Sequence, residues 1–398
     1  MKEVNIKTGF SQNRNEVKAI DEVFEQIRQE NIKLVIMFAD AGYNQLKINE
    51  AWREKIPQNT SFIGCSSLRL NLPFIRMTKN ITHQGFKDGI TAMSISSEKM
   101  NFSVKLMKNI KESWKEQSSQ ALIEAAKDLN LDLKNANPEK YFVLLLTDFF
   151  SAKEDYILEN LYKMSGLLFV GGGAGGKFNP MVKGNATPGY IHTKEGAFTN
   201  SAAIALVRCD IPFKIDLVTS LVPTEIKFKI TKGEGRFIYE LDGKPAFDKY
   251  IKALGVPRIA MGIEKIPNYR LLMAYPLGLM IGDRAYVRSI ATFKGKSLMM
   301  AANIKEGQVL HLMRRSNIVE VTREKVTGLK QKLGSISGLI LFNCCYRLLE
   351  SEMLGVSENL FKIINIAPLI GLNSYGEYYG WISMTHTLTI LAIGNSSN

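Results

Sequence analysis

The feature that most constrains the fold of this 398-residue chain is a pattern that occurs three times. Each copy runs from an apolar segment through a polar turn and a helix-like segment to a second apolar segment, a glycine-rich stretch and a later apolar segment. Strand–helix–strand connections of this kind are overwhelmingly right-handed and join parallel strands. The pattern therefore predicts three related units, at 33–96, 141–207 and 338–393, and in each unit the two strands joined by the helix are parallel.

Within these units the turns and the glycine-rich stretches both follow strands, at the edge where open sheets carry their ligands. The expected strands are 33–39, 61–63 and 91–96, then 141–146, 167–170 and 202–207, then 338–342, 363–366 and 387–393. The expected helices are 43–55, 154–164 and 348–360, the last with a break at Gly355.

A region of different character, 213–332, separates the second copy from the third. Segments 225–230 and 237–241 alternate apolar and polar residues around a glycine-containing turn, which predicts a hairpin. A short helix is expected at 246–254 and further strands at 283–292, 298–302 and 308–313. We expect an α/β fold, more fully a mixed α+β fold, of two intimately packed parts with mixed sheets, 1–212 and 213–398.

The composition excludes several classes of protein. Hydrophobic residues make up 45% and charged residues 22%, as in globular proteins and unlike disordered, collagen-like or coiled-coil chains. The net charge of +13 would suit an acidic partner. However, the Lys and Arg residues are spread along the chain, and no aromatic-basic signature of an RNA-binding sheet is found.

The cysteines predict neither a disulfide framework nor a zinc site, because they are few and lack metal-ligand spacing. We expect no metal, no cofactor and a reducing compartment. The first 16 residues lack the apolar core of a signal peptide, and the longest apolar stretch, 271–282, is too short to span a bilayer. A cytoplasmic protein without membrane insertion is the expectation.

The glycine run 171–176 is the most distinctive local motif. Glycine allows a ligand to approach backbone amides closely. The run follows an expected strand but lacks the helix opening of a dinucleotide fingerprint and the Gly-Lys-Ser/Thr ending of a phosphate loop. We therefore expect a loop that binds some other small ligand through Gly172, Gly173 and Gly175, with a purely structural turn as the alternative.

Two further motifs carry reactive or charged groups. Cys344 and Cys345 lie at a strand-to-turn junction just before Arg347, which could lower the pKa of a thiol and make it nucleophilic. Buried free cysteines are more often inert, and the four histidines are scattered. The glycine-bounded segment 375–381 combines Tyr375 and Glu377, which could hold an ammonium group, or could simply pack as an aromatic turn.

Six motifs follow one another along nearly the whole chain: Ile63-Gly64-Cys65-Ser66, Leu146-Thr147-Asp148, 171–176, 241–246, 342–347 and Tyr375-Gly376-Glu377. Their order resembles the FIST family, named for F-box and intracellular signal transduction domains. Residues 1–212 resemble its N-terminal part and 213–398 its C-terminal part. In place of the His-Asn-x-Thr run often found before the last strand of that family, this chain has Met384-Thr385-His386-Thr387.

The resemblance implies a sensory domain that binds small ligands, such as amino acids or their derivatives, with no established catalysis. We expect a non-catalytic small-molecule sensor that passes its state to a separate output protein, and we leave homo-oligomerisation open. A cysteine-dependent enzyme using Cys344 or Cys345 is the alternative, and a nucleic-acid-binding protein is the reading we favour least. The expected ligand-binding residues are Asp148, Gly172, Gly173, Gly175, Cys344, Arg347, Tyr375 and Glu377.

Overall fold

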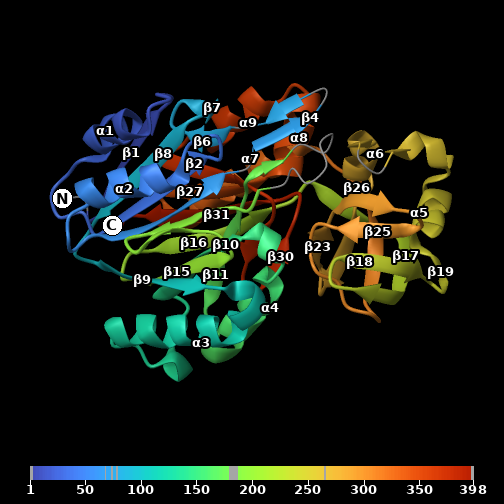
Figure 1. Cartoon of the computed structure of the whole chain (residues 1–398), viewed down its shortest axis with the longest axis horizontal. Helices are drawn as coiled ribbons and strands as arrows, with labels where there is room; N and C mark the ends of the chain where they lie inside the picture. The colour runs from blue at the N-terminus through green and yellow to red at the C-terminus, as the bar shows by residue number, and fades with distance from the viewer. Residues whose placement is uncertain are drawn as a thin grey trace.

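A computed structural model of the chain describes residues 3–67, 69–72, 75–77, 79–178, 187–263 and 266–395. Figure 1 shows two parts, a large core built from both ends of the chain and a smaller insert coloured yellow to orange. The fold is mixed α+β, as the sequence predicts. The core contains three repeats of one plan, which is strand, helix, strand, helix, strand, hairpin, strand, except that the second helix is split in the third repeat.

The first repeat comprises β1 (Asn5–Ser11), α1 (Glu16–Ile27), β2 (Leu34–Asp40), α2 (Gln45–Lys55), β3 (Ser61–Ser67), β6 (Asn80–Thr82), β7 (Gly85–Lys87) and β8 (Ile90–Ser96). The second comprises β9 (Met100–Lys108), α3 (Ile110–Asp128), β10 (Tyr141–Asp148), α4 (Glu154–Ser165), β11 (Leu168–Ala174), β13 (Ile191–Thr193), β14 (Gly196–Phe198) and β15 (Ser201–Cys209). The third comprises β16 (Phe213–Val218), α7 (Ile318–Leu333), β27 (Ile336–Cys344), α8 (Cys345–Met353), α9 (Ser357–Ile364), β28 (Leu369–Ser374), β29 (Glu377–Tyr379), β30 (Ile382–Met384) and β31 (Leu388–Gly394).

Each repeat builds a sheet with the same pairing. The two middle strands are parallel, as predicted, and the last strand returns antiparallel beside the first of them. The hairpin of each repeat, however, joins the sheet of another repeat, so the strand orders are β1-β8-β2-β3-β13-β14, β9-β15-β10-β11-β29-β30 and β16-β31-β27-β28-β6-β7. This exchange ties the N-terminal and C-terminal parts together, because the hairpin of repeat 1 completes the sheet of repeat 3.

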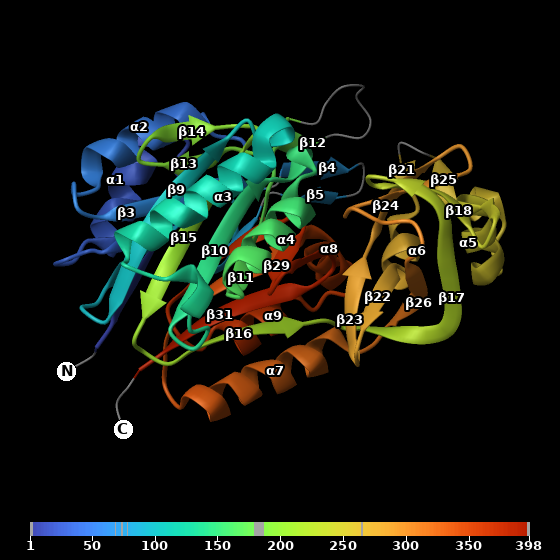
Figure 2. The same cartoon turned by 90° about the horizontal axis from the view of Figure 1, so that it is seen from below.

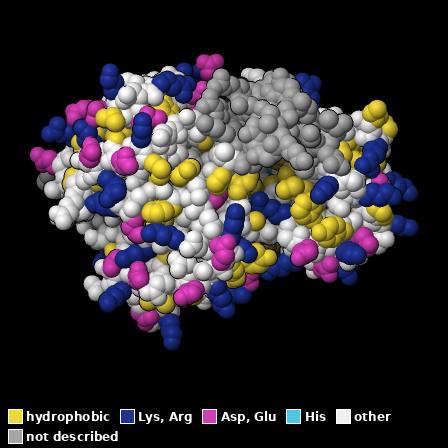
Figure 3. Space-filling model, viewed as in Figure 1, with side chains coloured by type: hydrophobic (Ala, Val, Ile, Leu, Met, Phe, Trp, Pro, Cys, Tyr) yellow, Lys and Arg dark blue, Asp and Glu magenta, His cyan; other side chains and the backbone are white. Residues whose placement is uncertain are grey.

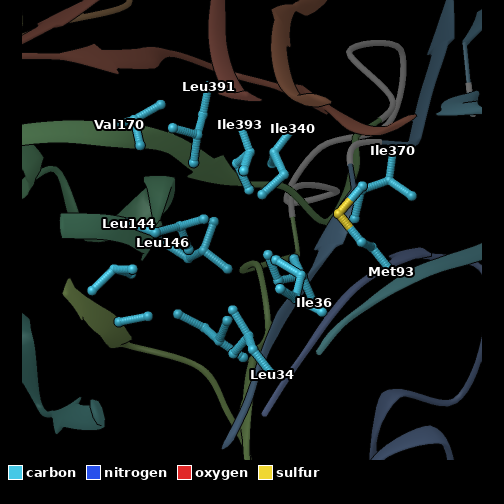
Figure 4. Packing of buried hydrophobic residues seen from close by; sticks show 14 of the residues in the cluster. Leu34, Ile36, Met93, Leu144, Leu146, Val170, Ile340, Ile370, Leu391 and Ile393 are labelled. Carbon is cyan, nitrogen blue, oxygen red and sulfur yellow. The ribbon is translucent and has the colours of Figure 1, made fainter. Parts of the chain in front are cut away.

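The three sheets face one shared hydrophobic core. Leu34 and Ile36, Leu144 and Leu146, and Ile340 point into it from the three β-sheets (Figure 4). The helices cover the outer faces, with α1 and α2 on the first sheet, α3 and α4 on the second, and α7 and α9 on the third. Figure 2 shows α7 along one side of the core. The strand segments therefore read as continuous apolar runs, because both faces of each strand are buried.

The insert, residues 221–315, follows the first strand of repeat 3 and has its own hydrophobic core. Its curved sheet has the order β23-β22-β26-β17-β18-β25-β24, and α5 and α6 accompany it. The hairpin and the 246–254 helix are confirmed. The elements are β17 (Leu221–Glu234), β18 (Phe237–Leu241), β19 (Lys244–Pro245), α5 (Ala246–Leu254), α6 (Tyr269–Ala274), β22 (Leu277–Ile281), β23 (Arg284–Arg288), β24 (Ile290–Lys294), β25 (Ser297–Met300) and β26 (Val309–Arg315).

Three local expectations were wrong. The first half of the glycine run is strand, since β11 continues to Ala174; strand pairing takes up the backbone there. Segment 363–366 is not a strand, because α9 continues to Ile364 and the strand begins at Leu369. The aromatic segment after Tyr375 contains the short strand β29 rather than being a loop throughout. The expected helix break at Gly355 is confirmed, with φ of +67°.

Candidate functional site

The structure brings together five of the predicted residues where β11, β27 and β28 end. Gly173 donates its N–H to the carbonyl of Gly376 at 2.8 Å and accepts from the amide of Tyr375 at 3.3 Å. Gly172 pairs with Glu377 across the β11–β29 ladder. Cys344 pairs with Ser374 in the β27–β28 ladder. Gly172, Gly173, Cys344, Tyr375 and Glu377 therefore share one strand-end junction, which we call the 2–3 junction because it joins repeats 2 and 3.

Asp148 and Gly175 lie instead near the contact between repeats 1 and 2. The Asp148 carboxylate accepts from the amides of Phe150, Gly189 and Asn200 at 2.9–3.1 Å. Burial raises the pKa of Asp148, although these three amides oppose the shift. Gly175 donates to the carbonyl of Ser66 at 3.1 Å. The Asp148 carboxylate therefore bonds to amides of its own repeat, whereas the Gly175 amide bonds to Ser66 of repeat 1.

Within the 2–3 junction, the side chain of Glu377 is fully buried. One carboxylate oxygen accepts from Ser374 Oγ at 2.6 Å, and the other accepts from the hydroxyl of Thr387 at 2.8 Å. Burial raises the pKa of Glu377 well above its ordinary value, against the lowering effect of these bonds. Its carboxyl group thus holds β28, β29 and β31 in place.

Arg347, on α8, is 3% exposed and bonds inward. Its two terminal nitrogens donate to Asn343 Oδ1 at 3.1 Å and to Thr322 Oγ1 at 2.6 Å. Burial lowers its pKa to about 10, so the guanidinium remains charged at neutral pH. Its Nε is buried and has no hydrogen-bond partner within the described part of the chain.

The cysteine thiols are buried at the start of α8. Burial raises the pKa of Cys344 well above its ordinary value, and contact with Cys345 adds to the effect. A thiol rather than a thiolate is therefore favoured at neutral pH, and thiols are poor nucleophiles. Arg347 therefore does not lower the pKa of Cys344 below its ordinary value, as an enzyme acting through a Cys344 thiolate would need.

Sequence reasoning missed a buried acid–histidine pair beside Arg347. His386 Nε2 lies 2.7 Å from Glu350 Oε2, and neither side chain is more than 1% exposed. The other carboxylate oxygen of Glu350 faces Arg315 of the insert at 3.7 Å. His386 has a φ of +62°, and its Nδ1 is buried without a partner in the described residues. The one available signal was that His386 occupies the variable position of the His-Asn-x-Thr run, just before Thr387.

An aromatic sandwich connects the 2–3 junction to the insert. The Phe149 ring stacks on Tyr375 with centroids 4.8 Å apart. The guanidinium of Arg236, in the β17–β18 turn, lies 4.0 Å from the centroid of the same Phe149 ring. Cation–π contacts of this kind are worth about 2 kcal/mol when desolvated. Tyr375 thus contacts the insert through one intervening ring.

Two buried ion pairs join the insert to the start of α4. Arg236 donates to Glu154 Oε1 at 2.7 Å, and Arg288 lies 3.2 Å from Asp155 Oδ1. Burial raises the pKa of Glu154, whereas Arg288 and the hydroxyl of Ser383 help to lower that of Asp155. Removing one partner of such a pair would leave a buried charge uncompensated.

Buried polar atoms without a hydrogen-bond partner accumulate along this core–insert boundary. In native proteins such atoms are uncommon and call for an explanation, often an ordered water or a ligand. Within the described ranges the boundary holds Glu154 Oε2, Arg236 Nε, Arg288 Nε, Ser289 Oγ, Arg347 Nε, Glu350 Oε1, Tyr375 Oη and His386 Nδ1.

Two structural features bear on alternative functions. In the described ranges no three or more His, Cys, Asp or Glu side chains gather as a metal site would require. None of the helices there combines the length and apolar character needed to cross a bilayer.

The fold and this boundary define a mixed α+β protein of three repeats whose candidate site lies against an insert. The FIST N domain model matches residues 33–244 and the FIST C domain model matches 246–380. The chain belongs to the FIST family, as the resemblance implied. FIST domains are generally described as small-molecule sensory domains in signal transduction. The two models divide within the insert, whereas residue 212 lies between repeats 2 and 3.

The individual proteins that are similar to this chain give no further evidence about its function. An uncharacterized protein of Methanocaldococcus jannaschii is 33% identical over 180 residues, which cover 39% of this chain and 35% of that protein. A chorismatase crystal structure aligns over 99% of this chain and 98% of its own, with a TM-score of 0.37 and 7% identity. A likeness at that level carries no argument about fold or function.

Proposed function

We propose that this protein binds a small polar molecule at the core–insert boundary and acts as a sensor in signal transduction. The observation that carries the proposal is the set of buried unpartnered polar atoms at this boundary. Arg347 Nε can donate, Glu350 Oε1 can accept, and Tyr375 Oη can do either. A ligand with both an anionic and a cationic group, such as an amino acid or a derivative, matches this mixture.

The predicted site is refined rather than replaced. Glu377 and the glycine amides at 172 and 173 make internal bonds or strand pairs, so in this proposal they shape the site and do not contact the ligand. Tyr375 and Arg347 keep a role as contacts, and Glu350 and His386 join them. Asp148 bonds within repeat 2, Gly175 bonds to Ser66 of repeat 1, and Cys344 is buried at the end of β27.

The signal would be a change in how the insert sits on the core. A ligand shifts such an equilibrium only through contacts that differ between two states. The stack of Arg236, Phe149 and Tyr375 supports this idea, since a ligand that displaces Tyr375 also disturbs an insert residue. A separate output protein would read the change, and the buried free thiols suit a cytoplasmic setting.

A thermal-shift screen of amino acids and related metabolites at millimolar concentration tests the proposal. We expect a stabilising compound whose effect is lost in Tyr375→Phe and kept in Tyr162→Phe, a matched change at an exposed tyrosine of α4. A screen without any stabilising compound, or equal loss in both variants, would contradict binding at this boundary.

A further inference from the structure

Most of the net positive charge of this protein is carried by the insert. Residues 221–315 contain 17 of the 51 Lys and Arg residues and 8 of the 38 Asp and Glu residues. The insert therefore carries +9 of the net +13, and the other 303 residues carry +4. On the insert face visible in Figure 3, Lys and Arg side chains are interspersed with hydrophobic ones. Such a charge distribution favours an anionic partner for the insert in particular.

Two aromatic rings lie side by side on the outer face of the insert sheet. Ile238 points into the insert core, so its neighbours Phe237 and Tyr239 point outward. Their rings are parallel within 6°, with centroids 6.3 Å apart, and Tyr239 is 38% exposed. An exposed tyrosine ring with a second ring parallel to it offers a flat surface on which a planar group can stack.

A shallow hollow of about 460 Å³ adjoins Tyr239. It is lined by Tyr239 and Pro245, by Glu240, and by two lysines from different strands, Lys232 and Lys296. Within the described residues, the ammonium group of Lys296 has one ion-pair contact, a long one of 3.7 Å with Asp248. No carboxylate of the described residues forms an ion pair with Lys232. The hollow therefore combines an aromatic wall, two available ammonium groups and one carboxylate.

We propose that this hollow binds a phosphate-bearing nucleobase, either as a mononucleotide or as part of a single strand. The base stacks on Tyr239, and Lys232 and Lys296 bind the phosphates. Glu240 accepts a hydrogen bond from the exocyclic amine of the base, as acidic residues do with cytosine. Aromatic stacking beside a basic groove is how single strands are bound without a deep pocket.

The neighbouring strand β17, which pairs with β18 in the interior of the sheet, extends the site. On β17, Lys227 and Lys229 are exposed. Phe228, which lies between them, and Ile230, which follows them, are buried. Alternation along a strand places both lysines on the same outer face as the rings. A single strand lying across β17 and β18 would meet these lysines as it leaves the hollow. This surface could not be predicted from the sequence, because its aromatic rings and its lysines come from separate segments of the chain.

Fluorescence anisotropy with fluorescein-labelled oligodeoxycytidylate tests the proposal on the full chain, with cytidine monophosphate as competitor. We expect Tyr239→Ala to weaken binding about tenfold and Tyr239→Phe to leave it unchanged, because stacking needs the ring alone. The double variant K232Q/K296Q should make the dependence of log K on log salt shallower by about 1.4, since single strands contribute about 0.7 per phosphate contact.

The matched control is K127Q/K134Q, which removes the same charge from exposed lysines of the core. Competition by cytidine monophosphate would identify a mononucleotide site, and competition only by unlabelled oligonucleotide would identify a single-strand site. The proposal is wrong if the probe does not bind at low salt, if Tyr239→Ala binds as well as wild type, or if both double variants weaken binding equally. The latter two results would indicate general attraction of polyanions.

Discussion

The junctions between repeats share one backbone plan but are filled by different side chains. In each sheet the exchanged hairpin places one buried residue opposite a glycine of the third strand: His192 opposite Gly64, Tyr378 opposite Gly171, and Ile81 opposite Gly371. A histidine, a tyrosine and an isoleucine thus occupy equivalent positions. The backbone arrangement of this protein is repeated, whereas the chemistry at each junction is specific to it.

Two buried histidines show the consequence. His192, at the junction of repeats 1 and 2, has Gln45 at 3.1 Å and Asn49 at 3.5 Å, one at each ring nitrogen. His386, near the 2–3 junction, has Glu350 at one ring nitrogen and no described partner at the other. The first environment is neutral and internally bonded. The second contains a carboxylate, leaves one ring nitrogen without a described partner, and lies against Arg315 of the insert.

The largest effect is expected from the three equivalent glycines. A Cβ at position 171 would lie 1.8 Å from the carbonyl oxygen of Leu145, and at position 64 it would lie 2.6 Å from that of Met37. At position 371 it would lie 2.8 Å from the terminal methyl of Ile81 and 2.9 Å from the Cβ atoms of Ile81 and Leu341. We expect Gly171→Ala to cost more than about 4 kcal/mol, and Gly371→Ala about 1–3 kcal/mol because these close contacts are with side-chain rather than backbone atoms.

Urea unfolding of the three alanine variants checks this order, and the yield of folded protein serves where Gly171→Ala does not fold. Gly85→Ala is a useful control, because its Cβ would meet no atom within 4 Å and only its φ of +109° is strained. If Gly371→Ala were the most damaging of the three, the equivalence of the junctions would not hold.

The sequence predicted the repeated units but not their exchange. The central strands and their helices are visible as apolar runs and amphipathic segments around 34–55 and 141–165. The hairpins β6–β7, β13–β14 and β29–β30 are too short for periodicity to reveal, and their partners lie in other repeats. Short-range patterns cannot specify such long-range pairing.

The sequence named eight residues for one site, and the structure brings only part of that set together. Tyr375 and Glu377 lie against Gly172 and Gly173, whereas the bonds of Asp148 and Gly175 lie elsewhere. The pattern could not show which way each side chain turns. Arg347 and Glu377 point inward to Asn343 and Ser374, and the contact between Glu350 and His386 joins residues 36 positions apart.

A second prediction compares the partners of the two histidines. Glu350→Ala removes a buried carboxylate that contacts His386 and faces Arg315, which leaves charged and polar groups uncompensated. We expect a loss of about 3–5 kcal/mol in the free energy of unfolding. Gln45→Ala removes a neutral partner of His192 and should cost about 1–3 kcal/mol. Chemical denaturation at pH 7 measures both, and equal losses would remove the distinction between the junctions.

A third prediction concerns pH. Burial lowers the pKa of His192 from its ordinary 6.5 to about 3. The unfolded chain therefore binds a proton at a higher pH than the folded chain, so the stability due to neutral His192 is present above pH 6.5 and declines as the pH falls toward 3. The loss at pH 5 is about 2 kcal/mol.

Because other groups also titrate, the test is a difference between variants. The loss of stability between pH 7 and pH 5 should be about 2 kcal/mol smaller in His192→Gln than in wild type. His83→Gln, at a partly exposed ring, should reduce it less. A wild-type slope retained in His192→Gln would mean that this histidine is already accessible to protons in the folded state.

The smallest effect on stability is expected at the residue most directly tied to the proposed function. Tyr375→Phe removes a buried hydroxyl that has no partner among the described residues and keeps the ring stacked on Phe149. Removing an unsatisfied polar group is neutral or stabilising, so the free energy of unfolding should stay the same or rise by up to about 1 kcal/mol. Thr147→Val is the contrasting variant, because its hydroxyl bonds Tyr378 and its loss should destabilise. A clear loss of stability in Tyr375→Phe would show that this hydroxyl already has a partner within the protein, which would contradict its proposed role as a ligand contact.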